Sequence, residues 1–250
     1  MESIRRINEN LLIIEGNIPS IRYTARRTTL GTEYAFVQEF LKRVIEYINC
    51  KSTFKTAIFI EPQLDSGYPD IVIIQYSLTT TQSLYTERTI LTNTHLKVLC
   101  EVDKQKRISI TRLSSILGFD LVALTGIVGE LEEAGLVRCR ARSVERAPYK
   151  DYFCIKKIIA IEAKIDKWSI AIEQAVHNTR FADESYVLMK RDKCNTFTEK
   201  RCNDLGVGVL LMNGNIHRAV KASRDKFAKP YITFLFNEWI QQIERMEGQK

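Results

Sequence analysis

The stretch DSGYPDIVII (Asp65–Ile74) sets a Pro-Asp pair at the mouth of an apolar run, and IIAIEAKIDKW (Ile158–Trp168) repeats the arrangement far down the chain with a glutamate and a lysine. Both runs are typical of short strands, and the second is rich in β-branched residues. Side chains at positions i and i+2 of a strand share a face, so Glu162 and Lys164 point to the same side while Ala163 turns away. We therefore expect charged groups to meet where these two strands end.

The neighbouring segments predict a mixed sheet covered by helices. Residues Glu33–Asn49 carry apolar side chains at helical spacing, and Thr56–Gln63 and Asp70–Ser77 are typical of two strands joined by a hairpin loop. A third strand is expected at Lys156–Ile165. Helices and strands then alternate at Trp168–Phe181, 185–189, Thr196–Asn203, Val207–Met212 and 231–246. This order indicates the α/β (α+β) class, with a mixed central sheet flanked by helices.

Residues 90–152 differ in character from the segments on either side and indicate an inserted domain. This run supplies a helix candidate at 93–106, a short strand, a helix that ends at Gly118, a longer helix at Asp120–Ala134 and a basic strand. We therefore expect a discontinuous core domain made of residues 1–89 and 153–250, interrupted by a small domain at 90–152.

Within this insert, ISITRLSSILG and FDLVALTGIVGELEEAGLVRCRA resemble the winged helix-turn-helix family. The resemblance implies that Asp120–Ala134 is the recognition helix and that the wing brings Arg138, Arg140 and Arg142 to DNA phosphates. The front of that helix offers Thr125 as its only neutral polar group for DNA bases. Base reading by the helix, phosphate contacts by the wing, and a role in packing or protein binding all stay open. The apolar residues expected to form the small core are Leu113, Ile116, Leu117, Leu121, Leu124, Val128, Leu131 and Leu136.

Without the insert, the strand that carries Asp70 is followed directly by the strand that carries Glu162 and Lys164, as neighbours in one sheet. Two carboxylates at the ends of paired strands can hold a hard divalent cation such as Mg²⁺, which prefers oxygen ligands and bridges to substrate phosphate. An ammonium beside that metal can position the attacking water or help to deprotonate it. This set predicts metal-assisted hydrolysis of a phosphodiester.

Pro69-Asp70 and Glu162-Ala163-Lys164 match the pattern of the PD-(D/E)xK nuclease superfamily, and the order of helix, hairpin, ExK strand and helix also resembles it. The resemblance covers the chain outside the insert. It implies a restriction-endonuclease-like fold with Mg²⁺ or Mn²⁺ as the cofactor. It also implies that Asp70, Glu162 and the Ala163 carbonyl bind the metal and that Lys164 is catalytic.

Relatives in that superfamily often add a glutamate from the first helix and a glutamine from the helix after ExK. Glu39 is the first candidate for this catalytic glutamate and Glu33 the second, and Gln174 matches the glutamine. Glu61, near the end of the preceding strand, is a further candidate ligand.

Each of these residues also has a purely structural interpretation. Glu162 and Lys164 can form an exposed ion pair worth under about 1 kcal/mol, and Asp70 can end the hairpin loop as a turn residue. Against this, they lie in strongly apolar runs, where charged groups are costly without partners or a metal. Trp168 fits a core or helix-start position better than a base-stacking platform, and His177 fits a partnered histidine better than a catalytic one.

Composition limits the remaining alternatives. The chain has 250 residues, 45% of them hydrophobic, and its six cysteines form no CxxC pair beside only three histidines. A zinc site is therefore not indicated, and free thiols in a reducing compartment are expected. The start lacks the features of a signal peptide, and no apolar run approaches the ~18 residues of a membrane span. We expect a cytoplasmic protein with no membrane contact.

The net charge of +7 is unevenly distributed. Lys190–Lys229 holds ten Lys/Arg against four Asp/Glu, and Val137–Lys150 holds five against one. Such basic regions suit a polyanion such as nucleic acid, although a moderate basic excess is often only a solvated surface.

Two functions remain. The first is a Mg²⁺-dependent DNA endonuclease acting on double-stranded or branched DNA, with the winged helix helping to place the duplex. The weak recognition helix favours structure-directed cleavage over a defined target sequence. The second is a non-catalytic DNA-binding or partner-binding protein that keeps a nuclease-like core. Two carboxylates beside a lysine favour the first function, and a homodimer is compatible with it.

Overall fold

The computed structural model describes residues 4–26, 30–49, 54–65, 67–77, 90–223 and 230–248. The chain divides into two compact units. We call Met1–Tyr76 with Ile155–Phe227 the sheet unit, and Ser77–Cys154 with Ala228–Lys250 the insert unit.

The sheet unit is built on a mixed sheet that has eight strands within the described residues. The strands are β1 (Ile4–Asn8), β2 (Leu11–Ile14), β3 (Lys55–Ile60), β4 (Ile71–Tyr76), β8 (Ile155–Ala163), β9 (Glu184–Lys190), β10 (Gly208–Asn213) and β11 (Asn215–Val220). They lie side by side in the order β1-β2-β3-β4-β8-β9-β10-β11. The pairs β2/β3, β8/β9 and β9/β10 are parallel, and the others are antiparallel.

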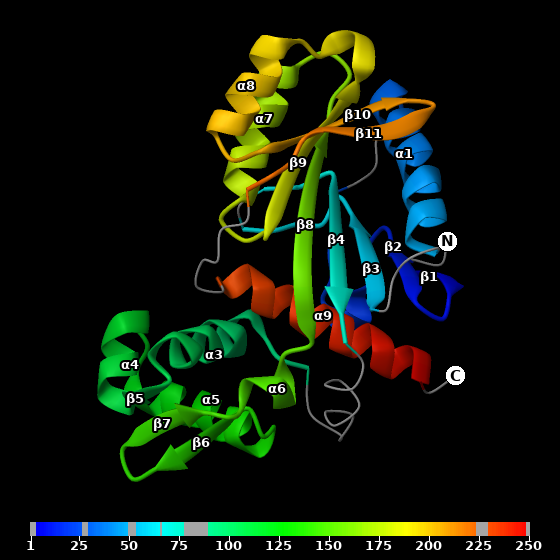
Figure 1. The fold of residues 1–250 in the computed structure, drawn as a ribbon. Helices are drawn as coiled ribbons and strands as arrows, with labels where there is room; N and C mark the ends of the chain where they lie inside the picture. Colours follow the sequence, from blue (N-terminus) through cyan, green and yellow to red (C-terminus); the bar gives the residue numbers. More distant parts are fainter. Residues whose placement is uncertain are drawn as a thin grey trace. The chain divides into compact units, whose positions relative to one another are not determined.

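Helices cover both faces of this sheet, with α1 (Thr32–Asn49) on one side and α7 (Trp168–Asn178) and α8 (Thr196–Asp204) on the other (Figure 1). The alternation of side chains along the strands explains both layers. Ile161 and Ala163 of β8 share an apolar cluster with α1. Val187 and Met189 of β9 share a second cluster with α7. The predicted class, a mixed α/β protein with a large sheet flanked by helices, is confirmed.

Strands β4 and β8 are antiparallel neighbours, as the sequence predicts for the strands next to Asp70 and the ExK motif. Ile71 lies opposite Ile161, and the register continues along both strands. Extending this register by one residue sets Asp70 opposite Glu162, and opposed residues of an antiparallel pair share a face with Cβ atoms about 4.5–5.5 Å apart. The sheet therefore brings together two carboxylates that the insert separates in sequence.

The insert unit combines helices with a small three-stranded sheet of order β5-β7-β6. Its helices are α3 (Asn93–Gln105), α4 (Ile110–Leu117), α5 (Leu121–Glu133), α6 (Tyr149–Tyr152) and α9 (Tyr231–Gly248), and its strands are β5 (Arg107–Ser109), β6 (Val137–Arg140) and β7 (Ser143–Arg146). Gly118 ends α4 in the left-handed conformation. Asp120 then caps α5 by accepting from the Val122 and Ala123 N–H groups, and the two helices are bent by 110°. A short turn at this angle is a helix-turn-helix.

Five of the apolar residues predicted for the core of the insert are buried: Leu113, Leu124, Val128, Leu131 and Leu136. Ile116 and Leu121 are instead 45% exposed, and Leu117 is only partly buried. The prediction is wrong for these residues because they flank the turn between α4 and α5. Helical periodicity restarts at such a turn, so spacing does not decide which way their side chains face.

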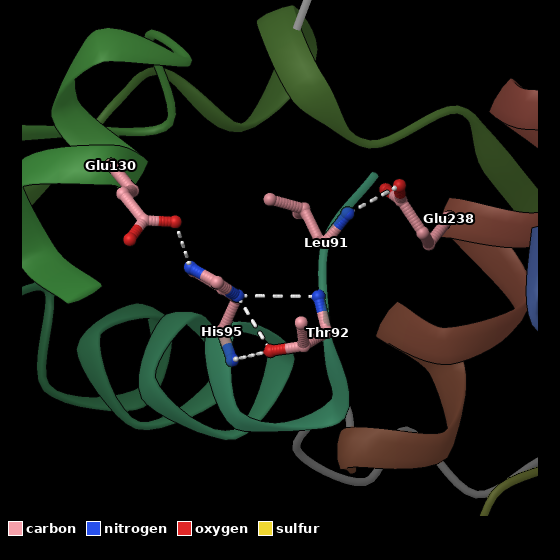
Figure 2. A network of polar contacts seen from close by, with 5 residues as sticks. All are labelled: Leu91, Thr92, His95, Glu130 and Glu238. Carbon is pink, nitrogen blue, oxygen red and sulfur yellow. Dashed lines mark hydrogen bonds and ion pairs between the residues drawn. The ribbon is translucent and has the colours of Figure 1, made fainter. Parts of the chain in front are cut away.

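A polar network joins the start of α3 to other elements of this unit (Figure 2). The Thr92 hydroxyl accepts from the His95 N–H at 3.3 Å, and His95 Nδ1 accepts from the Thr92 N–H at 3.2 Å. Because Nδ1 accepts, a neutral imidazole carries its proton on Nε2, which donates to Glu130 of α5 at 2.9 Å. The Leu91 N–H donates to Glu238 of α9 at 3.1 Å. The His95 side chain and the Leu91 N–H at the start of α3 thus connect this helix to α5 and α9.

Helix α9 belongs to the insert unit, whereas the sequence assigned 153–250 to the core domain. Asn237 and Gln241 of α9 donate to the Tyr152 carbonyl at 2.9 and 2.6 Å, and Asn237 accepts from the Cys154 N–H at 2.8 Å. These buried amides satisfy backbone groups where the chain leaves the insert. Helical periodicity in the sequence does not reveal that α9 contacts this part of the backbone. The predicted boundary of the core domain therefore differs from the observed division.

No single helix among the described residues is long and apolar enough to cross a membrane. Helices α4 and α5 reach that length and composition only when taken together, as a bent pair.

Gly208 of β10 provides a test of the sheet packing. A Cβ at this position would collide with the Tyr186 ring and lie 2.8 Å from the Ala222 nitrogen. We expect Gly208→Ala to lower the free energy of unfolding by roughly 1–3 kcal/mol in urea denaturation. The control is Gly129→Ala in α5, where a Cβ meets open space and should raise stability by up to about 1 kcal/mol. Equal effects of the two substitutions would contradict the packing described.

Candidate functional site

Asp70, directly before β4, makes a hydrogen bond to a residue that follows the insert in sequence. Its Oδ2 accepts a hydrogen bond from the Ala163 N–H of β8 at 2.7 Å. Burial raises the pKa of Asp70, and the Lys164 ammonium and the Ala163 N–H offset this rise only in part. The carboxylate therefore lies where additional positive charge would stabilise its ionised form.

Lys164 follows the last residue of β8 and forms two ion pairs. Its Nζ lies 3.0 Å from Glu33 Oε2 and 4.0 Å from Asp70 Oδ2. Burial lowers the pKa of Lys164, but the carboxylates of Asp70 and Glu33 more than offset this, so the net shift is upward. Lys164 is therefore a charged ammonium at neutral pH and acts here as a donor and a positive charge.

Glu162 is almost completely buried, with 1% of its surface exposed. Its Oε1 accepts from Asn178 Nδ2 of α7 at 2.7 Å, while its Oε2 is buried without a hydrogen-bond partner. Burial raises the pKa of Glu162 to about 8, and the Asp70 carboxylate adds to the rise against the effects of Asn178 and Lys164. A buried, unpartnered carboxylate oxygen is costly. A proton, an ordered water or a cation would satisfy Oε2.

Glu61, directly after β3, joins the same cluster. Its φ of 47° is rare outside glycine, and a backbone of this kind costs on the order of 1–3 kcal/mol. Its N–H donates to the Asp70 carbonyl at 3.0 Å, and its carbonyl accepts from the Arg26 N–H at 2.9 Å. Burial raises the pKa of Glu61, with a further rise from Asp70, and its Oε2 is also buried without a partner. Strained backbone together with an unpartnered oxygen is a combination that functional sites tolerate.

Asp70, Lys164 and Glu61 line a pocket of about 100 Å³ between the start of α1 and the ends of β3, β4 and β8. A water molecule occupies about 30 Å³ of liquid, so the pocket has room for an ion with a few waters. Glu162 is not among the described lining residues, although its pKa reflects the nearby charges of Asp70 and Lys164. The lining residues are Arg26, Glu33, Tyr34, Val37, Ile60, Glu61, Asp70, Ala163 and Lys164.

The helix glutamate at this pocket is Glu33. Glu39, the first candidate from the sequence, is exposed and lies outside the pocket lining among the described residues. Helix α1 begins at Thr32, and its first turns alone reach the pocket, through Glu33, Tyr34 and Val37. The choice between the two glutamates depends on where the helix begins relative to β8, which periodicity along α1 does not reveal.

Helix α7 contributes Asn178, which the sequence did not single out. Gln174, the predicted residue, is half-buried, and its Oε1 is buried without a partner. Asn178 comes one turn later on the same helix face and makes the hydrogen bond to Glu162. The sequence did contain a signal for Asn178, because it is a second amide four residues after Gln174 and so lies on the same helix face.

A divalent ion fits the donor set by chemistry. The described residues hold no group of three or more His, Cys, Asp or Glu side chains gathered as a metal site. The predicted ligands, which are the carboxylates of Asp70 and Glu162 and the Ala163 carbonyl, are a smaller set. Such a set suits Mg²⁺ because this ion usually keeps several waters. The unpartnered oxygens of Glu61 and Glu162 are the hard ligands that such an ion prefers.

In the insert unit, β6 and β7 form an antiparallel hairpin at the place where the sequence predicts a wing. Arg138, Arg140 and Arg142 are all exposed there, and the contact of Arg140 with Glu145 is long, at 3.9 Å. An exposed pair at this distance contributes little and leaves the guanidinium accessible. Thr125 of α5 is exposed, and its hydroxyl donates to the Leu121 carbonyl at 2.7 Å. The hairpin thus presents three exposed arginines, whereas the Thr125 hydroxyl already donates its hydrogen within its own helix.

No protein-family model matches this chain, and no curated protein or solved structure matches it. The case for a function therefore rests on the geometry and chemistry of the site.

Burial of Glu162 predicts a pH-dependent stability in metal-free buffer. Its pKa rises from 4.5 to about 8 on folding, so the folded state holds the proton more tightly. This stabilisation is complete below the lower pKa and is lost as pH rises through the higher one. Glu162→Gln removes the titration at constant shape. Its free energy of unfolding should match that of wild type near pH 4.5 and exceed it near pH 9 by on the order of a few kcal/mol.

Denaturant titrations at both pH values, with EDTA present, measure this difference. Glu39→Gln is the control, because it removes an exposed carboxyl from α1 and should change stability by less than about 0.5 kcal/mol. A Glu162→Gln variant that gains nothing at high pH would show that Glu162 is solvated.

Proposed function

We propose that this chain is a divalent-metal-dependent nuclease that hydrolyses phosphodiester bonds in DNA. The observation that carries the proposal is the ion pair of Asp70 with Lys164 where β4 and β8 pair, with Glu162 near enough for both charges to affect its pKa and with one of its carboxylate oxygens buried and unpartnered. Structural ion pairs do not require a buried oxygen without a partner. A bound cation would give that oxygen a partner.

The fold order supports a restriction-endonuclease-like core. Helix α1, the pair β3 and β4, strand β8 and helix α7 follow one another as the resemblance to PD-(D/E)xK nucleases implies. Asp70, Glu162 and the Ala163 carbonyl would hold Mg²⁺ or Mn²⁺. Such an ion, when bound, lowers the pKa of the attacking water and neutralises charge on the phosphate.

Lys164 supplies a fixed positive charge next to these ligands. Its ammonium has three donors, enough to keep an ion pair and still hold a water or a phosphate oxygen. Glu33, 3.0 Å from Nζ, holds the lysine from the α1 side and is a positioning residue. The upward pKa shift of Lys164 supports a role in orientation and charge neutralisation and argues against a role as the base.

The exposed wing supports DNA as the substrate class. Three arginines on one hairpin suit phosphate contacts, which carry affinity without sequence information. At the front of α5, Val122 is 82% exposed and offers no hydrogen bond to a base edge. This combination favours cleavage directed by DNA structure over cleavage at a defined sequence.

Removing a metal ligand should damage chemistry far more than binding. We expect Asp70→Ala and Glu162→Ala to abolish Mg²⁺-dependent cleavage while keeping DNA affinity in EDTA within about threefold of wild type. Lys164→Ala should lower the rate by roughly 100-fold or more, because the water and phosphate lose their fixed cation. The assay is nicking and linearisation of supercoiled plasmid and of branched DNA with Mg²⁺ or Mn²⁺.

Glu39→Ala is the matched control, since it removes an exposed glutamate from the same helix as Glu33 and should cut like wild type. Variants of Asp70 and Glu162 that cut like wild type would show that the site is wrongly assigned. Wild type that binds DNA but cuts neither DNA nor RNA would favour the alternative, a non-catalytic binding protein on a nuclease-like scaffold.

The wing gives a separate prediction about affinity. Replacing Arg138, Arg140 and Arg142 together by glutamine should weaken binding to a similar degree across sequences. The slope of log affinity against log salt should fall by up to about 2.7, the value for three phosphate contacts. Anisotropy titrations over a salt series measure this slope, and an unchanged slope would assign the insert to packing or to a protein partner.

A further inference from the structure

Aromatic and basic side chains gather at the edge of the sheet where Lys164 lies. Strands β8 and β9 are parallel, with Ala163 opposite Leu188. Lys164 and Lys190 therefore both lie at the carboxyl ends of these strands. The two helices that follow these strands begin nearby. Trp168 is the first residue of α7, and Phe197 lies in the first turn of α8.

Phe197 is 65% exposed, although Thr198 and Cys202 of the same helix are completely buried. Helix α8 therefore packs one face on the core and turns the phenylalanine outward. A single exposed apolar residue is ordinary. The surroundings of Phe197 make it informative.

Arg201 comes one turn after Phe197 on the same helix face. Its guanidinium lies 6.0 Å from the centroid of the Trp168 ring, and Trp168 in turn packs against the core formed by α7, β9 and β10. This cation–π contact restricts the guanidinium. An aromatic ring and a restrained planar cation therefore lie side by side on α8.

Positive charge dominates this surface. Residues 190–201 hold five Lys/Arg against two Asp/Glu. Beside Arg201, the cations of this stretch are all exposed: Lys190, Arg191, Lys193 and Lys200. Lys193 contacts Asp166 at 3.5 Å, but both side chains are about half exposed or more, so the contact is weak.

We propose that Phe197 and Arg201 form a stacking platform for unpaired bases of a nucleic-acid strand, with Lys190, Arg191 and Lys200 contacting its phosphates. Aromatic rings and guanidinium planes both stack on base faces, and these faces are accessible only where bases are unpaired. A duplex offers the same phosphates but hides its base faces. The charge of the surface therefore suits any nucleic acid, and the exposed ring selects the single strand.

The platform deepens the proposed nuclease function and rests on it for its role. A strand held at Phe197 and Arg201 would pass the edge of the sheet that carries Lys164. The substrate class is then a nucleic acid with an unpaired end, flap or branch, which the wing alone does not select.

The test is binding of a labelled 15-nucleotide oligo(dT) in EDTA, measured by anisotropy. Phe197→Leu keeps an exposed apolar side chain without the ring and should weaken binding roughly tenfold or more. Phe197→Tyr keeps the ring and should bind within about twofold of wild type. Arg201→Lys keeps the charge without the planar group and should weaken binding severalfold. Since Phe197 is exposed, circular dichroism melts of the Leu and Tyr variants should coincide with wild type.

An abasic oligomer of the same length separates stacking from charge. It should bind more weakly than oligo(dT) to wild type and equally to wild type and Phe197→Leu. Oligo(U) of the same length distinguishes RNA from DNA as the source of the strand, and ring-dependent binding of either one supports the platform. Equal affinity of wild type and Phe197→Leu for both oligo(dT) and oligo(U) would overturn it.

Failure of this inference and failure of the proposed function give different results. Ring-dependent binding in EDTA without any cleavage on adding Mg²⁺ or Mn²⁺ keeps the platform and removes the nuclease. Cleavage that requires Asp70 and Glu162, together with binding indifferent to the ring, keeps the nuclease and removes the platform.

Discussion

The hydrogen bond from the Ala163 N–H to the Asp70 carboxylate joins two strand ends that the insert separates by 93 positions in sequence. It continues the antiparallel register of β4 and β8, in which Ile71 lies opposite Ile161. Extending that register by one residue sets Asp70 opposite Glu162, and the Lys164 ammonium lies 4.0 Å from Asp70 Oδ2. A slip of one residue would turn Glu162 to the other face of the sheet. The rest of the site depends on this pairing.

The site gathers more negative than positive groups in a partly buried place. Asp70, Glu61 and Glu162 each have a raised pKa, with burial as the first cause. Lys164 compensates only part of that charge, since two carboxylate oxygens remain buried and unpartnered. A proton on Glu162, whose pKa is about 8, or a bound divalent cation can complete the balance. The pH dependence of stability and the proposed metal binding thus have one electrostatic origin.

The central part of the fold was predictable from the sequence, because the apolar run after Asp70 and the one before Lys164 are short and rich in β-branched residues. The choice of Glu33 over Glu39 was not, since it depends on which turn of α1 reaches β8. Tertiary pairing also decided the place of α9, through Asn237 and the backbone that leaves the insert. Strand β2 was not predicted from the sequence. It is four residues long and fully buried, so it lacks the alternation of apolar and polar residues by which a strand is identified.

The most direct test of the account is anomalous diffraction from crystals grown with millimolar Mn²⁺. We expect an anomalous peak bound by carboxylate oxygens of Asp70 and Glu162, with Lys164 close by, and no such peak in crystals of Asp70→Ala. A wild-type structure that shows no peak there, and that retains the unpartnered Glu162 oxygen at saturating Mn²⁺, would contradict it.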